Sequence, residues 1–197
     1  MTSTALRTAV GFLVCVVLLL GASAFVAQIA QQTDFPEPPS DLTRVYYLAG
    51  NTLVALPFEP GALPFDIFQP AVDNRITRVR VSGPKAKTVL TNENLRFFVF
   101  VGDRMDPPPH QLVRLTTNNA ERSLKISLIK GRKGYAPFAE DNVPLERRIL
   151  RRMKVSAGVN RFLFVNYLEL RPRGPLRPGE YAIIGDSFAD VATFRVE

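Results

Sequence analysis

The residues best suited to chemistry are a serine near the carboxyl end and the chain's single histidine. Ser187 follows the apolar run of residues 181–184 and stands directly after Gly185 and Asp186. A serine becomes a nucleophile when a neighbouring base removes its proton. The one histidine, His110, lies far upstream behind three prolines, and ten residues follow Ser187. We therefore interpret Ser187 as part of a turn between two short strands.

The Gly-Asp-Ser sequence at residues 185–187 resembles the first block of the GDSL (SGNH) esterases. That resemblance implies a three-layer α/β fold, in which a long series of strands and helices and a late Asp–His pair follow the block. This chain has room for neither after Ser187. The resemblance is thus confined to three residues, and we do not predict an esterase.

Other catalytic and metal-binding patterns are equally weak. Most zinc sites need at least two nitrogen or sulfur ligands from His and Cys, and beyond the apolar amino-terminal segment, which contains Cys15, the chain has only His110. Neither an Asp-x-Asp-x-Asp-Gly calcium loop nor a Gly-x-Gly-x-x-Gly phosphate motif occurs. We predict no catalytic residue, no metal site and no cofactor, and therefore no enzyme. A hydrolase whose carboxylate pair is assembled by the fold stays open, because such a pair leaves no local signal.

The amino terminus has the three-part pattern of an export signal. Arg7 precedes an uncharged apolar stretch that ends in Ala22-Ser23-Ala24. We expect a signal peptide at residues 1–24. Because nothing charged occurs between Arg7 and Asp34, an uncut anchor helix reaching to about residue 30 is the alternative. Both interpretations place the remaining chain in the periplasm or outside the cell, with membrane contact only through the uncut segment.

Cys15 is the only cysteine, and it lies within the apolar stretch. After cleavage the chain would hold no thiol, so neither a disulfide nor a cysteine-based metal site could form. Burial of a core must then stabilise the exported body. A domain of about 170 residues buries roughly 70% of the surface that its unfolded chain exposes, which is sufficient.

The proline-rich stretch 31–42 is predicted to be a linker, and residues 43–197 a single β domain. Residues 44–49 and 52–56 flank Gly50-Asn51, a pair typical of tight hairpin turns, so 44–56 is predicted to be a hairpin, with the alternative that it forms a sub-module. Residues 57–70 contain four prolines. We expect this segment to wrap an edge and not to form a central strand, because proline lacks a ladder donor.

Several later segments have the patterns of strands. Residues 76–81 alternate apolar and basic side chains, which is typical of a half-buried strand, and residues 95–101 are apolar on both faces, as in a central strand. Residues 179–184 and 191–196 are predicted as two closing strands. Leu145 to Met153 has apolar residues at helical spacing but runs into a strand-like sequence, so helix and strand both stay open for this segment.

The tail reads Leu-x-Pro-Gly-Glu-Tyr-Ala from Leu176 to Ala182 and Phe-x-Val from Phe194 to Val196. In this pattern it resembles the closing strands of a pool of uncharacterised secreted bacterial proteins with Ig-like sandwiches. The hairpin at 45–56 is similar to their opening hairpin. The resemblance implies an all-β, Ig-like antiparallel β-sandwich, with Glu180 facing solvent and Tyr181 anchoring the corner through its hydroxyl.

The net charge of +7 is concentrated in one part of the chain. Residues 122–173 contain thirteen Lys or Arg and four acids. The densest group, a predicted patch for an anionic partner, comprises Arg147, Arg148, Arg151, Arg152 and Lys154. Such a field attracts polyanions, and export favours an envelope protein, an anionic glycan or an anionic lipid surface over nucleic acid.

These observations predict an exported, non-enzymatic binding or assembly protein of the bacterial cell envelope, whose basic face meets an anionic partner. Two alternatives stay open. One is the secreted hydrolase with a carboxylate pair, and the other is a subunit of a surface filament assembled by strand addition.

Overall fold

The structure is a computed structural model that describes residues 35–62, 76–91, 94–103, 110–128, 135–158, 161–185 and 190–197. The chain divides into two units, Met1–Pro36 and Glu37–Glu197, and every described strand belongs to the second. The described part of this unit is all-β, without a helix, as the sequence predicts. The described residues accordingly hold no helix that could span a membrane. The expected signal or anchor helix lies outside them.

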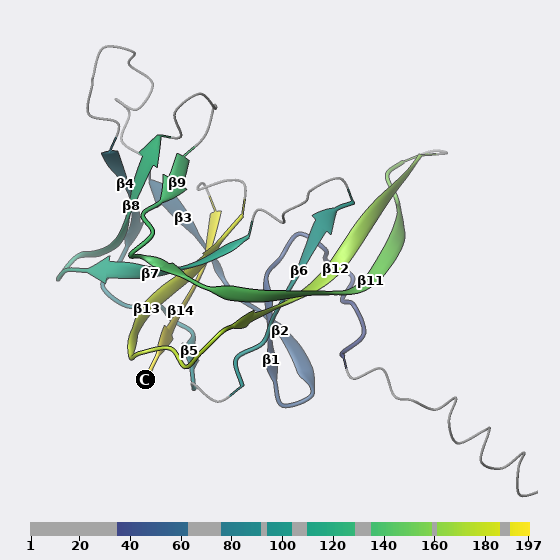
Figure 1. Ribbon diagram of the computed structural model, residues 1–197, viewed down its shortest axis with the longest axis horizontal. Helices are drawn as coiled ribbons and strands as arrows, with labels where there is room; N and C mark the ends of the chain where they lie inside the picture. Colours follow the sequence, from purple (N-terminus) through teal and green to yellow (C-terminus); the bar gives the residue numbers. More distant parts are fainter. Residues whose placement is uncertain are drawn as a thin grey trace, which may run out of the picture. The chain divides into compact units, whose positions relative to one another are not determined.

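The first sheet is antiparallel throughout and has the strand order β11-β12-β6-β1-β2 (Figure 1). Its strands are β1 (Tyr46–Ala49), β2 (Thr52–Ala55), β6 (Phe97–Gly102), β11 (Leu145–Ser156) and β12 (Phe162–Pro172). β12 is the one partner of β11 among the described strands, so β11 forms an edge of this sheet.

The second sheet has the order β10-β7-β13-β14-β3-β4-β8-β9, and β5 also pairs with β14. Its strands are β3 (Phe58–Ala62), β4 (Ile76–Ser82), β5 (Val89–Leu90), β7 (Gln111–Thr117), β8 (Glu121–Leu128), β9 (Tyr135–Pro137), β10 (Asn142–Val143), β13 (Gly179–Ile184) and β14 (Asp190–Val196). An additional β7–β8 pairing joins the two ends of the run from β7 to β8. The six strands β7, β13, β14, β3, β4 and β8 therefore form a closed ring.

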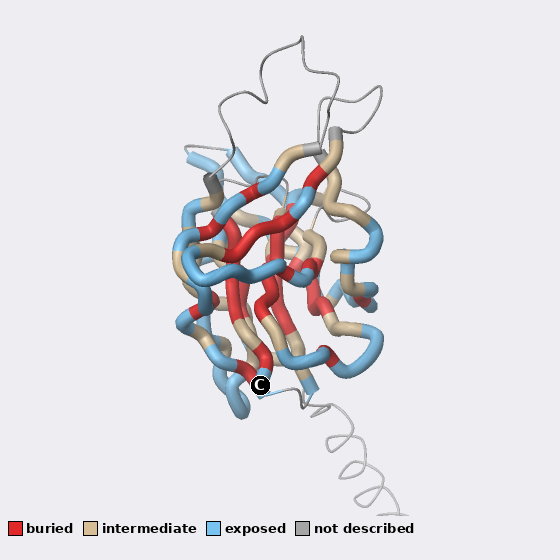
Figure 2. Tube along the Cα trace, turned by 90° about the vertical axis from the view of Figure 1, so that its left-hand side faces the viewer, coloured by how far each residue is buried: buried red, intermediate tan, exposed pale blue. Residues whose placement is uncertain are grey.

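Two apolar clusters fill this architecture, and β13 contributes to both. Tyr181 and Ile183 belong to a cluster that joins the two sheets, whereas Ala182 and Ile184 belong to a cluster built from the strands of the ring. The split follows from the two-residue period of a strand, which sends neighbouring side chains to opposite faces. Figure 2 shows the buried stretches of the central strands in red. A strand buried on both faces reads as a continuous apolar run, as Tyr181 to Ile184 does.

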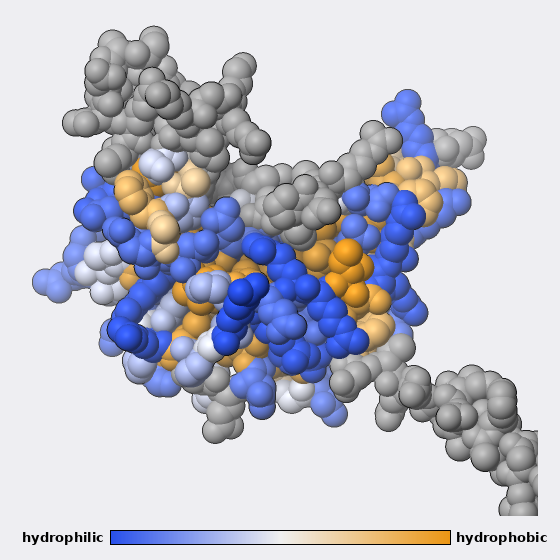
Figure 3. All heavy atoms as spheres, viewed as in Figure 1, coloured by the Kyte–Doolittle hydropathy of each residue, from blue (hydrophilic) through white to orange (hydrophobic). Residues whose placement is uncertain are grey.

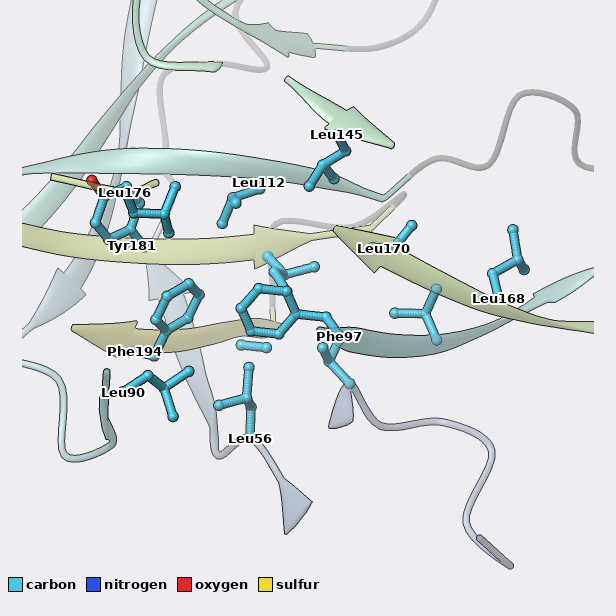
Figure 4. Packing of buried hydrophobic residues seen from close by; sticks show 14 of the residues in the cluster. Leu56, Leu90, Phe97, Leu112, Leu145, Leu168, Leu170, Leu176, Tyr181 and Phe194 are labelled. Carbon is cyan, nitrogen blue, oxygen red and sulfur yellow. The ribbon is translucent and has the colours of Figure 1, made fainter. Parts of the chain in front are cut away.

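The first cluster lies between the sheets, which gives a sandwich-like arrangement. Figure 4 shows Phe97 and Leu170 of the first sheet beside Tyr181, Phe194 and Leu112 of the second. The ring of Phe97 lies 5.0 Å from that of Phe194, and Phe194 stacks on Tyr181 at 5.6 Å between ring centroids. Aromatic pairs at these distances add about 0.5–1.5 kcal/mol each to the stabilisation from burial.

The predicted hairpin at the start of the body is confirmed by the β1–β2 pair. Residue Ala49 pairs with Thr52 across the turn, and Gly50 has a φ of 61°. Asn51 is not among the described residues with positive φ. Positive φ at the first of the two turn residues is the type II′ pattern, which favours glycine at that position and matches the strand twist.

The prediction that residues 57–70 form no central strand is wrong for the part that the structure describes. β3 lies between β14 and β4. Pro60 is tolerated because β3 changes its partner at this point. It pairs with β14 through residues 58–60 and with β4 only through Gly61 and Ala62. Pro60 therefore has no partner in β4, and a missing N–H on that side breaks no ladder hydrogen bond. Of the phenylalanines in this segment expected at the margin of the core, Phe58 packs half-buried on the inter-sheet cluster, and Phe65 and Phe68 lie outside the described residues.

The segment from Leu145 to Met153 is a strand, the first part of β11. Its apolar spacing imitates a helix partly because the strand has a register shift between Ile149 and Arg151, where one extra residue, Leu150, enters the ladder. The other predicted strands are confirmed: β4 buries Val79 and Val81, and β6 lies inside its sheet between β12 and β1.

Candidate functional site

The five cations predicted as an anionic-partner patch all lie on the edge strand β11. The strand divides them between its two faces. Arg148 and Arg151 pair with Glu169 and Tyr167 of β12, whereas Arg147 and Arg152 pair with Leu170 and Asn166. Residues directly opposite in an antiparallel pair share a face, so Arg148 and Arg151 lie on one side and Arg147, Arg152 and Lys154 on the other. The cations form a ridge along the edge, which is accessible from both faces.

Three of these cations have ionic or hydrogen-bond partners among the described residues. Arg151 Nη1 lies 3.2 Å from Glu37 Oε2, and Arg152 Nη2 lies 2.5 Å from Asp103 Oδ2. Arg147 donates to the carbonyl oxygen of His110 at 3.1 Å. The three arginines are exposed, whereas Asp103 is half-buried, and an ion pair at the surface contributes at most about 1 kcal/mol. An incoming anion can therefore compete for the arginines at little cost.

The free end of the β11–β12 hairpin carries large exposed apolar side chains. The exposed fractions are 55% for Phe162, 60% for Leu163 and 45% for Phe164. β12 pairs with β6 only from Val165 onward, so these three residues extend beyond the end of the β6 ladder. Figure 3 shows apolar and hydrophilic residues mixed where the two strands end, at the upper right of the view. We call Lys154–Ser156 with Phe162–Phe164 the hairpin end.

Cations of β11 lie over the aromatic rings of the hairpin end. Lys154 Nζ is 3.9 Å from the ring centroid of Phe162, and the guanidinium carbon of Arg152 is 4.3 Å from that of Phe164. Such contacts contribute about 0.5–1 kcal/mol at exposed sites. They hold the long side chains along the rings, so charge and apolar surface are presented together.

A buried charge cluster at the ring strands was missed in the sequence. Arg122 of β8 is 1% exposed. Its Nη2 lies 2.5 Å from Glu59 Oε2, and its guanidinium also donates to the carbonyls of Ser82 at 2.9 Å and Gly83 at 3.0 Å. Glu180 Oε2 lies 4.0 Å from its Nη1. A signal was present, because Arg122 has the same parity as the buried Leu124 and Ile126 and so must point to the same face of β8.

Glu59 is held ionised by its neighbours. Burial acts to raise the pKa of Glu59, but hydrogen bonds from Arg122 and Thr193 outweigh it and hold the pKa below its usual value. Thr193 lies on the same side of β14 as Val191, and Val191 pairs with Glu59. The three polar side chains thus meet on one side of the ring strands.

The expectation that Glu180 faces solvent is wrong. Its exposed fraction is 6%, and its carboxylate accepts a hydrogen bond from the backbone N–H of Ala86 at 2.8 Å. Glu180 has the same parity on β13 as Ala182 and Ile184, whose side chains belong to the ring cluster. The closure of the ring turns this side of β13 inward, which a single-strand pattern does not indicate.

A second buried acid, Glu169, lies on the opposite side of β12 from the inter-sheet cluster. It accepts hydrogen bonds from Arg96 and, at 2.7 Å, from Arg171. Burial acts to raise the pKa of Glu169, but these two arginines outweigh it and lower the pKa. Burial also raises the pKa of the neighbouring Tyr167, whose ring stacks on Phe100 at 4.9 Å. This polar and aromatic group stabilises the sheet that carries β11.

For the hydrolase alternative, we consider Glu59 and Glu180, two described acids that lie beside the same buried arginine. Both lie beside the guanidinium of Arg122 and are largely buried. A general acid or base must reach a substrate proton, and these carboxylates are instead engaged by buried donors. Ser187 lies outside the described residues. Among the residues that the structure describes, no three His, Cys, Asp or Glu side chains are grouped to hold a metal ion.

The corner expected from the tail is confirmed. The Tyr181 hydroxyl donates to the carbonyl oxygen of Arg177 at 2.7 Å, and burial raises the pKa of this tyrosine. The bond fixes the turn that enters β13.

Compared with protein-family models, curated proteins and solved structures, the chain matches none of them. The resemblance to secreted Ig-like proteins therefore stays a prediction.

Proposed function

We propose that the protein is an exported, non-enzymatic binding protein of the cell envelope, and that the β11–β12 hairpin is its contact with an anionic partner. One observation carries this proposal: the five cations of the predicted patch lie along one exposed edge strand and lead to the hairpin end. Glu37 and Asp103 neutralise this ridge only in part. An anionic surface would gain from the remaining field.

We also propose that the β domain has the Ig-like type of antiparallel β-sandwich fold. Two facing sheets and the Tyr181 corner support this. Two features depart from the simplest form of that fold. β5 pairs with β14 in parallel, and the second sheet closes into a ring. We interpret both as additions to the sandwich.

The test is a salt titration of binding to a soluble polyanion such as heparin. It uses the protein in the form that cells export, with its amino terminus read by mass spectrometry. We expect the logarithm of the association constant to fall linearly with the logarithm of salt concentration. The variant Arg148→Gln/Arg151→Gln/Lys154→Gln should bind more weakly with a shallower slope. Affinity that ignores both salt and these substitutions would reject the proposal.

A matched control removes the same number of cations elsewhere. Arg78 and Arg80 are exposed on β4, and Arg44 precedes β1. The variant Arg44→Gln/Arg78→Gln/Arg80→Gln has the same net charge as the β11 variant. If the two variants lose affinity equally, the attraction belongs to the net charge of the protein and not to the β11 edge.

One observation favours the filament alternative as a second candidate. β11 presents its outer backbone edge without a partner among the described strands, and such an edge can accept another strand. Two copies of β11 side by side would bring their cations together, which costs energy. A filament of this kind would therefore join β11 to an acidic strand of a different protein, and sedimentation of the purified protein alone should show no filaments.

A further inference from the structure

The exposed apolar residues at the hairpin end are unusual in their grouping. Phe162, Leu163 and Phe164 are consecutive, and each has close to half or more of its surface exposed. Single exposed apolar residues are common on protein surfaces, but contiguous groups mark a surface that binds another protein or a membrane. The arrangement of these side chains at the hairpin end indicates the kind of partner.

The apolar side chains lie on both faces of the two-stranded end. Phe162 pairs with Ser156 and Phe164 with Lys154, which places both rings on one face. Leu163 pairs with Val155, and these two side chains lie on the opposite face. A groove in a rigid partner protein would cover one face and leave the other in water. A fluid lipid layer can surround both faces.

The charge around the hairpin end selects a negative layer. Lys154 and Arg161 are exposed, and Arg151 and Arg152 precede Lys154 on β11. Each Lys or Arg near an anionic membrane surface increases partition to that surface about fivefold. Lys154 and Arg152 lie over the phenyl rings of Phe162 and Phe164, so charge and apolar surface would meet the boundary between headgroups and acyl chains together.

We propose that the hairpin end inserts Phe162, Leu163 and Phe164 into the interface of an anionic lipid bilayer. This inference rests on the proposed function and names its partner, and it adds a membrane contact beyond the amino-terminal segment. The insertion is shallow. The outer edge of β11 has backbone groups with no strand partner among the described residues, and such groups cannot enter hydrocarbon without loss of hydrogen bonds. The side chains therefore stop at the boundary between headgroups and acyl chains.

A single tryptophan tests the proposal locally. The chain contains no tryptophan, so Leu163→Trp creates the only indole in the protein. We expect its emission to shift to the blue, and to be quenched by lipids brominated in the acyl chain, when vesicles of phosphatidylcholine and phosphatidylglycerol are added. Vesicles of phosphatidylcholine alone should give a smaller shift. Because the reporter is local, a shift cannot arise from the apolar amino terminus alone.

The matched control is Val89→Trp. Val89 is 43% exposed and lies on β5 of the second sheet, away from the hairpin. Its emission should not change with vesicles. A triple variant, Phe162→Ser/Leu163→Ser/Phe164→Ser, should weaken partition into anionic vesicles by about tenfold or more, because even shallow insertion removes part of the surface of each apolar side chain from water. Far-UV circular dichroism checks that each variant is folded, and Phe164→Trp is a second reporter.

The outcomes separate this inference from the proposed function. If Leu163→Trp behaves as Val89→Trp does while salt-dependent binding to heparin persists, the lipid inference is overturned and the proposed function stands. If its emission shifts with protein concentration before vesicles are added, the hairpin end binds a second copy, and the inference is again overturned. If neither heparin nor vesicles bind, both proposals fail.

Discussion

The first prediction concerns Arg122, whose removal should be the most costly single change in the described part of the chain. Arg122→Met keeps much of the side-chain volume and removes the charge. It leaves the carboxylates of Glu59 and Glu180 buried beside an apolar group, and it removes a donor from the carbonyls of Ser82 and Gly83. Breaking a buried pair by removing one partner costs about 3–5 kcal/mol. The lost carbonyl bonds place the expected change near the upper end.

The assay is guanidinium chloride unfolding followed by far-UV circular dichroism, at pH 7 and at lower pH. The pH dependence gives the reasoning a second check. In the natural protein the pKa of Glu59 is lowered, so its contribution is present above 4.5, the value in an unfolded chain, and is lost as the pH falls through the native value. In Arg122→Met the unpaired carboxylate should have a raised pKa, because burial is no longer compensated. Stability of the variant should then increase as the pH is lowered from 7.

A change below about 1 kcal/mol at pH 7, or a loss that does not depend on pH, would refute this account of the cluster. Typical domains have about 5–15 kcal/mol of stability in total, so Arg122→Met can leave too little for a measurable folded state. Thr193→Val is the milder companion. It keeps the shape of Thr193 and removes one hydrogen bond to Glu59, and it should cost about 1.5–3 kcal/mol.

Three further predictions concern stability. Tyr181→Phe removes a buried hydrogen bond to a backbone carbonyl and should lower the free energy of unfolding by about 1 kcal/mol, measured by denaturant titration; no change would mean that the corner bond is exchanged for water without loss. Gly50→Ala adds a Cβ in open space at a residue with φ 61° and should lower the free energy of unfolding by about 1 kcal/mol. Gly102→Ala also adds a Cβ in open space, but without positive φ, and should lower it less. Equal losses would contradict the role given to the turn. The lowered pKa values of Glu59 and Glu169 predict that the melting temperature decreases as the pH falls below about 4.5, and a melting temperature that is constant from pH 7 to pH 3 would contradict both ion-pair assignments.

The strands could be predicted from the sequence where one pattern decides the structure. Alternation predicts β4, and the run from Tyr181 to Ile184 predicts a strand buried on both faces. The same reasoning failed for β3, because the rule against proline in central strands assumes that a strand has partners on both sides at each residue. β3 changes partner after Pro60.

The side chains that carry charge inside the protein were harder to predict. Glu180 was expected to face solvent from its place in the tail pattern. The inward direction of that face follows only from the β7–β8 pairing, which joins segments with no shared pattern in the sequence. Arg122 could have been found from its parity with Leu124 and Ile126, but its acidic partners come from β3 and β13.

The candidate site was predicted in part. The cations of β11 are visible as a charge run, and the structure adds that they occupy an edge strand. The exposed hairpin end was not predicted, since Phe162 to Phe164 have the composition of a core strand. They are exposed because β6 pairs with β12 only from Val165 onward. The sequence of β12 does not indicate where its neighbour β6 ends.

Hydrogen–deuterium exchange of the exported protein, with and without anionic vesicles, tests the central claim most directly. The account predicts that added vesicles slow amide exchange at the hairpin end and along the outer edge of β11, while exchange at the opposite edge strand β2 is unchanged. Slowed exchange at β2 with none at β11, or no change anywhere despite binding, would contradict it.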